Sequence, residues 1–573
     1  MSDYWQRQAI RAQRRAVLKG GVAFAVGTAG LALVGCGDDD SGGSVGPTPQ
    51  GQTQPAGGSI KPGGTLQAHR ILDLKVDPLP TTQVDGHVFA AHVYGRLVGL
   101  KTYTDPSKFQ YETIPDLADS WEQPDEVTVT FKLNPSAKYH DKPPVNGRAV
   151  EATDVVESFK KFKAQVATNI NSKVFDPVVD GEPVALDAHT IQFKTKGPQA
   201  SFIYLCAAPV YFWLYPKELL DNDKARTDTP VGFGPWMFKA KQEGVAWDFD
   251  ANPSYHRKDE AGRQLPYAKA SRVNVIPEYQ NRLSQLQAGN IDFADINPED
   301  AATVASFGTV LKYGPATAGA SGFPIQMRKG TYSKDPRIRR ALSMLIDRDA
   351  FNHLFFKNDG RWVNPTGPAA PWYEDPATGK DSWAKYYLYN PAEAKKLLDA
   401  ASFTEEIPVA YNANGYGEVH VQQAQFVIDA FRKAGLKVKD LPLDYRTQYI
   451  AAGGAYSGNY DGLLHAPTAF DGDPHTYLNN HFQSQSGRNI SGVNDPEIDS
   501  LIQKLASTFK PEQRIQFAKD ILRKNVDQVW YMGIGGGPLY RGLNKRVQNF
   551  KWMPDRSEPA DSWIHAWLDD SKR

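Results

Sequence analysis

The sequence predicts a mixed α/β protein, because strand and helix patterns alternate along most of its 573 residues. Three segments alternate apolar and polar residues, as strands with one buried face do. They are residues 127–133, 190–194 and 272–275. No tract of low complexity interrupts the chain beyond its N-terminal part, so most of the sequence belongs to folded domains.

Apolar residues at helical spacing mark the helices between these strands. Residues 155–162 form one apolar stripe, and four later stripes begin beside a proline, which the first turn of a helix tolerates. Three of those prolines follow an Asp or Asn that can cap the helix. The four starts are Asp335-Pro336, Asn390-Pro391, Asp495-Pro496 and Pro511. Glu393 is also placed to complete a capping box.

The composition describes a large body with no internal disulfide. Lys+Arg and Asp+Glu both number 65, but residues 1–35 hold five basic residues and one acidic residue, so the remainder has a net charge of −4. Such a balance gives no electrostatic reason to bind nucleic acid. Of the two cysteines, Cys206 lies in an apolar run and is expected to be buried. At about 100–200 residues per domain, the length predicts roughly three to five domains.

Residues 1–36 have the pattern of an export signal with a lipobox. A basic segment containing Arg14 and Arg15 precedes an apolar stretch that ends at Cys36. The stretch is short for a membrane span, which needs about 20 apolar residues, so a signal is favoured over an anchor helix. The arginine pair resembles a twin-arginine signal, with an ordinary Sec signal as the alternative. Cleavage before Cys36 would leave it lipidated, and residues 37–60 would form a flexible tether.

No compact catalytic motif is present, so neither an enzyme nor a cofactor is expected. The sequence lacks a zinc-protease helix motif, a nucleophile elbow, a phosphate loop and a paired Cys-x-x-Cys. One group of residues could suit a divalent metal, but its spacing matches no metal motif and a polar loop is favoured. It comprises His465, Asp471, Asp473, His475 and His481.

Two further patterns receive a structural interpretation. Glycines at 533, 535, 536 and 537 lack the spacing of a dinucleotide-binding loop and end in Pro538, which predicts a flexible loop. The basic residues at 337, 339 and 340 lie opposite the apolar stripe of their helix. They therefore predict a solvated or ion-paired face instead of a nucleic-acid contact.

Blocks along nearly the whole body resemble the family 5 extracellular solute-binding proteins, the oligopeptide, dipeptide and nickel type receptors of ABC importers. Each block is weak alone, but their order along the chain matches the family. They lie at residues 93–98, 114–121, 131–141, 154–159, 230–236, 252–255, 282–292, 337–348 and 489–499.

The resemblance implies a two-lobe clamp of the type II periplasmic-binding-protein class with three domains. Domain I would combine residues 61–100, 226–322 and 535–573, domain II would span 101–225 and domain III 323–534. Closure of the lobes would enclose the ligand without chemistry.

The implied protein is a lipid-anchored receptor in the periplasm or on the outer face of the cytoplasmic membrane. It would be a monomer that delivers a peptide or similar polar solute to an ABC permease. An oligosaccharide or a metal chelate is the alternative ligand, and an exported hydrolase or a sensor that uses the same clamp without transport is the alternative function.

Residues 460–474 look like the loop that lines the binding cleft in this family. In peptide receptors an aspartate three residues before the acid-proline pair binds the α-ammonium group of the ligand, but Phe470 holds that position here. A phenyl ring cannot neutralise an ammonium group, so Asp471 is the candidate replacement if Gly472 shifts the register; a turn-stabilising role is the alternative. His465 and Asp473 complete the candidate ligand-binding set.

Overall fold

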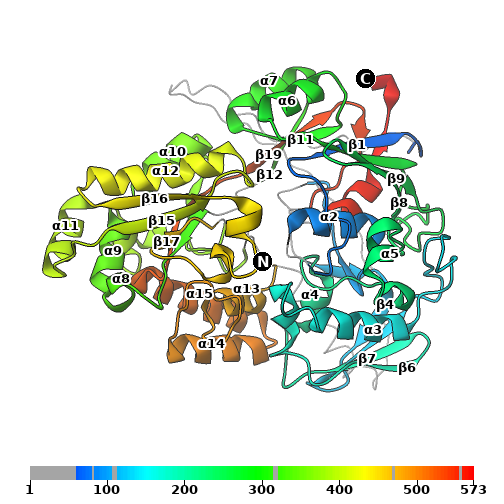
Figure 1. The fold of residues 1–573 in the computed structure, drawn as a ribbon, viewed down its shortest axis with the longest axis horizontal. Helices are drawn as coiled ribbons and strands as arrows, with labels where there is room; N and C mark the ends of the chain where they lie inside the picture. Colours follow the sequence, from blue (N-terminus) through cyan, green and yellow to red (C-terminus); the bar gives the residue numbers. More distant parts are fainter. Residues whose placement is uncertain are drawn as a thin grey trace, which may run out of the picture.

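Two lobes, each built on its own sheets and apolar core, face each other in the structure (Figure 1). The computed structural model describes residues 60–80, 83–105, 112–313, 321–368, 370–466, 472–553 and 558–572. The first lobe contains the described residues up to 313 together with those from 538 onward, and the second lobe contains 321–537. The mixed α/β prediction is confirmed. Within the described ranges, no helix is both long and apolar enough to cross a membrane.

Strands from distant parts of the sequence join in the first lobe. Strand β1 (Thr65–Arg70) runs parallel to β10 (Ala270–Val275), and the sheet continues through β9 (Ala246–Ala251) to β8 (Trp236–Gln242). A second sheet has the order β11-β19-β12. Its strands are β11 (Phe293–Ile296), β12 (Gly308–Tyr313) and β19 (Leu539–Asn544). Helix α2 (Val84–Val93) is buried along nearly its whole length beside the first sheet.

A four-stranded antiparallel sheet forms the other half of the first lobe. Its order is β4-β5-β7-β6, with strands Ala118–Glu122, Thr128–Leu133, Thr190–Lys194 and Val184–Asp187 in that order. Helix α3 (Ala152–Lys163) packs on it, as its apolar stripe predicted, and begins with a capping box between Glu151 and Asp154. Phe159 and Phe193 join an apolar core that continues into the rest of the first lobe.

The second lobe carries two small sheets and most of the long helices. One sheet is parallel, in the order β16-β15-β17, and the other is antiparallel, in the order β13-β18-β14. The strands are β13 (Ser321–Pro324), β14 (Arg361–Trp362), β15 (Ile407–Asn412), β16 (Val438–Leu443), β17 (Leu463–Leu464) and β18 (Tyr531–Gly536). The main helices are α9 (Pro336–Met344), α10 (Arg348–Phe356), α11 (Pro391–Ala400), α12 (Glu418–Lys433), α13 (Pro474–Phe482), α14 (Pro496–Ser507) and α15 (Pro511–Gln528).

The predicted helix starts are confirmed for the four proline-marked helices. Asp335, Asn390 and Asp495 each accept a backbone N–H from the first turn, and proline occupies the first turn in every case. These caps depend on residues two or three positions apart, which explains why the sequence revealed them.

The glycine-rich segment near 535 is a buried strand, so the prediction of a flexible loop is wrong. Residues 531–536 form β18 at the centre of its sheet. A Cβ atom at Gly533 would lie 2.0 Å from the carbonyl oxygen of Val363, so only glycine fits this close backbone approach. The chain then passes through Pro538 into β19 of the first lobe, which makes this one of two crossings between the lobes; the other follows β12.

Two further predictions concern single side chains. Cys206 is buried in α4 (Phe202–Ala207), as expected, and burial raises the pKa of its thiol. Arg337 and Arg340 pair with Asp335 and Asp527, but Arg339 departs from the predicted solvated or ion-paired face. Arg339 is buried and donates hydrogen bonds to the carbonyl oxygens of residues 332, 333 and 528.

Candidate functional site

Two cavities lie between the lobes. The strand-end cavity, of about 430 Å³, is lined by first-lobe residues around the end of β1 and by second-lobe residues 415, 416 and 445. The seam cavity, of about 550 Å³, is lined by residues 173–199 of the first lobe and residues 475–506 of the second. In Figure 1 the elements that line the two cavities lie toward opposite ends of the interface between the lobes.

Aromatic rings from both lobes wall the strand-end cavity. Phe293 and Trp563 come from the first lobe, whereas Tyr416 and Tyr445 come from the second. Tyr416 and Tyr445 pack edge to face, with ring centroids 5.2 Å apart. Apolar walls with a few fixed polar groups are typical of sites for small polar molecules.

The strand-end cavity carries more negative than positive charge. Arg70 pairs with Asp85 at 3.0 Å. Arg541 pairs with Asp295 at 2.8 Å and also with Glu558, so two arginines face three carboxylates. Burial disfavours ionisation of Asp295, but the charge and the hydrogen bond of Arg541, acting together with the other cationic neighbours, hold the pKa of the carboxyl below its usual value.

His69 adds no positive charge to this cavity at neutral pH. Burial lowers its pKa to about 3; Asp295 opposes this shift, and nearby arginines add to it. The wall residues themselves therefore comprise three carboxylates and two positively charged arginines, and Arg282 lies near enough to interact with Asp295.

His465 lies behind the strand-end cavity and does not line it. Its ring stacks on Phe323 at 4.6 Å and on His420 at 3.9 Å, and His420 contacts Tyr416 of the cavity wall. Ser321 hydrogen-bonds the Nε2 atom of His465 at 2.9 Å, and burial lowers the pKa of His465 well below its usual value. These contacts make His465 a neutral residue that supports the wall.

Asp473 is held by contacts within the second lobe. It caps α13 by accepting the N–H of Thr476, and it pairs with Arg514 at 2.8 Å, both side chains being buried. Phe470 and Asp471 lie outside the described residues. His465 and Asp473 thus stand before and after segment 467–471.

The histidines of the suspected metal group have separate partners. His475 bonds Ser201 at 2.9 Å, and His481 bonds the carbonyl oxygen of Tyr477 at 2.7 Å. Where the structure describes the chain, no three His, Cys, Asp or Glu residues are arranged to hold a metal ion.

Direct hydrogen bonds join the two lobes along a seam, which shows that the structure is a closed clamp. These contacts cannot be predicted from the sequence, because the partners lie far apart along the chain. The seam bonds are Gly472 N to Tyr204 Oη (2.7 Å), Ser201 Oγ with His475 Nδ1 (2.9 Å), Asn480 Nδ2 to Tyr211 Oη (3.0 Å), Ala200 N to the carbonyl oxygen of Ala506 (3.0 Å), and Arg488 to Asn171.

Comparison with known proteins identifies the family. Residues 112–489 match the profile of the bacterial extracellular solute-binding proteins, family 5 (middle region). The chain belongs to this family. It is therefore an exported solute-binding protein of the two-lobe type II class and not an enzyme, as the sequence blocks predicted.

Relatives cover nearly the whole body of the chain. Di/tripeptide-binding protein 2 of Pseudomonas aeruginosa is 24% identical over 501 residues, which cover 83% of this chain and 90% of the relative. The periplasmic binding protein DppA from Helicobacter pylori, in complex with the peptide STSA, has a TM-score of 0.74 at 20% identity and covers 89% of this chain and 99% of its own. NikA from Brucella suis, in complex with Fe(III)-EDTA, has a TM-score of 0.69 at 19% identity and covers 88% and 100%. The same fold thus encloses ligands of different chemistry.

Proposed function

We propose that the protein is the receptor of an ABC importer for a small polar solute that carries an ammonium group, most simply a short peptide. The excess carboxylate of the strand-end cavity is the observation that supports this ligand class. A buried ammonium group needs a carboxylate partner, and Asp85, Asp295 and Glu558 outnumber the two arginines beside them. The volume of about 430 Å³ lies in the range of small-ligand sites.

Segment 460–474 is proposed as the binding-cleft loop. Phe470 would supply an apolar wall and Asp471 a second acceptor for the ammonium group. His465 and Asp473 would fix the two ends of the loop through the ring stack and the Arg514 ion pair. In this arrangement Phe470 and Asp471 would contact the solute, whereas His465 and Asp473 would hold the loop in position.

The proposed domains keep the boundaries given by the family resemblance. Domain I (61–100, 226–322 and 535–573) and domain II (101–225) would form the first lobe and domain III (323–534) the second, except that residues 321–322 and 535–537 belong to strands or connections of the second lobe. The shared apolar core of the first lobe supports a rigid unit made from domains I and II. The two chain crossings would serve as the hinge.

Export and anchoring are proposed from the N-terminal sequence. Arg14 and Arg15 would direct translocation, and Cys36 would carry the lipid that holds the monomer on the membrane, with residues 37–60 as tether. Each buried methylene of the acyl chains contributes about 0.8 kcal/mol to membrane binding. The anchored receptor would release its solute to the permease subunits.

A thermal-shift screen tests the ligand class. Purified protein is heated with di- and tripeptides and with the same peptides acetylated at the N-terminus. We expect saturable stabilisation by free peptides, little by acetylated ones, and recovery of intact peptide by mass spectrometry. Glu558→Gln should weaken this response, whereas the exposed control Asp250→Asn, whose carboxylate pairs with Lys239, should not. Equal responses to free and acetylated peptides would contradict the ammonium assignment.

A further inference from the structure

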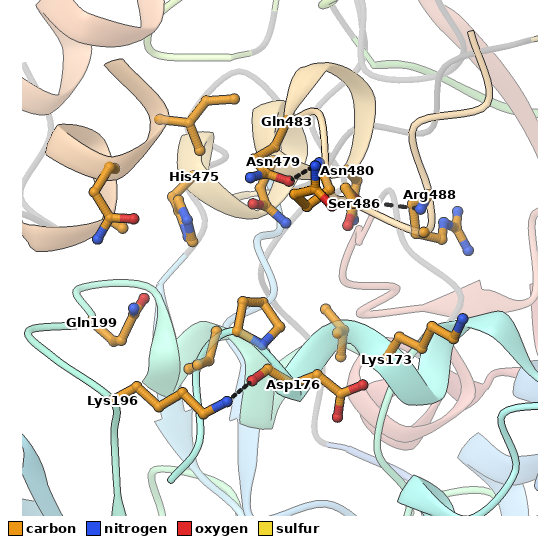
Figure 2. A pocket seen from close by; sticks show the side chains of 18 of the residues that line it. Lys173, Asp176, Lys196, Gln199, His475, Asn479, Asn480, Gln483, Ser486 and Arg488 are labelled. Atoms are coloured by element: carbon orange, nitrogen blue, oxygen red, sulfur yellow. Dashed lines mark hydrogen bonds between the residues drawn. The ribbon is translucent and has the colours of Figure 1, made fainter. Parts of the chain in front are cut away.

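The seam cavity is a second site whose wall combines side chains of both lobes. Figure 2 shows Lys173, Lys196 and Gln199 on one side and His475, Asn479 and Arg488 on the other. Lys173 lies in the helical turn Ile170–Phe175, and Arg488 follows α13. The cavity exists only while the lobes are closed, because each lobe supplies half of the wall.

Three cations line this cavity without a carboxylate partner. Lys196 donates to the backbone oxygen of Asp176 at 2.7 Å, and Arg488 donates to the neutral side chain of Asn171 and lies over a tyrosine ring. Among the described residues, no carboxylate pairs with Lys173, Lys196 or Arg488. Three positive charges therefore face the cavity without direct neutralisation.

The two carboxylates of the wall are already engaged elsewhere. Asp176 pairs with Lys163, outside the cavity, at 3.4 Å. Asp499 accepts hydrogen bonds from both the backbone N–H and the hydroxyl of Ser484. Among the described residues, neither carboxylate forms an ion pair with Lys173, Lys196 or Arg488.

Amide side chains supply further hydrogen-bonding groups to the cavity. Gln199 is only 8% exposed, and its Oε1 atom has no hydrogen-bond partner. Figure 2 shows its amide directed into the space between the lobes, with Asn479 and Gln483 on the opposite wall. The buried Oε1 atom only accepts hydrogen bonds, so a bound ligand would remove its free-energy cost through a donor, such as the hydroxyl of hydrogen phosphate or of citrate.

Closure places like charges close together at the seam. The Lys173 side chain packs against Gly487 of the other lobe, so near that a Cβ atom at Gly487 would lie 3.3 Å from Lys173 Cδ. Arg488 is the next residue, and Figure 2 shows Lys173 and Arg488 facing each other. Their repulsion opposes closure unless an anion lies between them.

We propose that the seam cavity binds a compact anion, a carboxylate or phosphate group, which bridges Lys173 of the first lobe to Arg488 of the second, while Lys196 adds positive charge at the other end of the cavity. The bound anion neutralises the seam and stabilises the closed clamp. This site lies apart from the proposed ammonium site and does not depend on the peptide class of the solute; the group is supplied by a free small anion.

Calorimetry and thermal shift on the purified full chain test the site with citrate and inorganic phosphate at constant ionic strength, with sodium chloride as the reference. We expect saturable binding by the wild type and at least tenfold weaker binding by Lys173→Gln and by Arg488→Gln. The exposed first-lobe variant Lys258→Gln should match the wild type. Unfolding temperatures of the variants without anion check that each one folds.

A second arm separates the two sources of the anion. Tripeptides with a free C-terminal carboxylate are compared with their C-terminal amides. Citrate binding with equal peptide affinities supports a free anion. If the wild type binds free-acid tripeptides more tightly than their amides and Lys173→Gln abolishes this difference, the cavity binds an anion, but the anion is the C-terminal carboxylate of the solute. No citrate or phosphate binding together with equal peptide affinities overturns the proposal, and leaves the receptor function intact if peptides still bind.

Discussion

Ser201→Ala removes one hydrogen bond of the seam and should weaken solute binding without lowering the stability of either lobe. Ser201 is fully buried and His475 is 6% exposed in the closed clamp, where Ser201 Oγ and His475 Nδ1 lie 2.9 Å apart. The variant leaves the Nδ1 atom of His475 buried without its partner. Such a loss costs about 1–3 kcal/mol.

The cost of Ser201→Ala falls on the closed form alone, because opening the lobes returns both groups to water. A loss of about 1–3 kcal/mol changes an equilibrium roughly 5- to 150-fold. If the ligand-free clamp is mainly open, the closed fraction that can bind the solute falls by the same factor. The apparent Kd therefore rises by that factor. The unfolding temperature of the ligand-free protein should stay at the wild-type value.

Calorimetry with the best peptide of the screen measures this effect, and Ser158→Ala is the matched control. Ser158 is also buried, but its hydroxyl bonds the backbone of Tyr215 within the first lobe. Ser158→Ala should therefore lower the unfolding temperature and leave the Kd unchanged. A Ser201→Ala protein with wild-type affinity, or one with the same loss of stability as Ser158→Ala, would refute the reasoning.

Three further predictions follow from single residues. Gly533→Ala should lower the unfolding temperature, because overpacking costs about 1–3 kcal/mol and a lobe of this size loses roughly 2–4 °C per kcal/mol. The control Gly197→Ala, where a Cβ atom would meet open space, should leave the unfolding temperature unchanged. Equal melting curves for the two variants would contradict the close packing at Gly533. Burial lowers the pKa of His475 to about 4; the charge of Asp473 opposes this shift and the charge of Arg514 adds to it. If opening the lobes exposes His475 to water, the open form binds a proton more readily than the closed form. Solute affinity measured by calorimetry should therefore fall as the pH drops below about 6.5, by at most about tenfold per pH unit, and His475→Gln should flatten the profile; an unchanged slope would exclude this link. Asp471→Ala should raise the Kd of a cationic solute, and unchanged affinity would remove Asp471 from the site.

Local features of the fold could be predicted from the sequence, whereas features that join distant residues could not. The caps at Asp335 and Asn390 depend on their immediate neighbours and were found. The sequence around Gly533 predicts a loop instead of a strand, because its close partner Val363 lies 170 positions away and nothing near the glycines indicates it. Arg339 was misplaced for the same reason, since its acceptors include the carbonyl oxygen of residue 528.

The same contrast between local and distant features applies to the candidate site. Segment 460–474 remains a prediction from the sequence as the binding loop, and two of its residues, His465 and Asp473, are held by contacts within the second lobe. The carboxylates of the strand-end cavity were missed, because Asp85, Asp295 and Glu558 come from three separated stretches with no motif. Only the folded chain shows that they outnumber the arginines beside them.

Small-angle X-ray scattering during titration with the best peptide tests the central claim most directly, that two lobes close on a solute and leave it unaltered. We expect the radius of gyration to fall as peptide is added and to reach a plateau at one equivalent, with all of the peptide recovered intact. A scattering curve that stays constant while calorimetry shows saturation would contradict closure as the basis of binding.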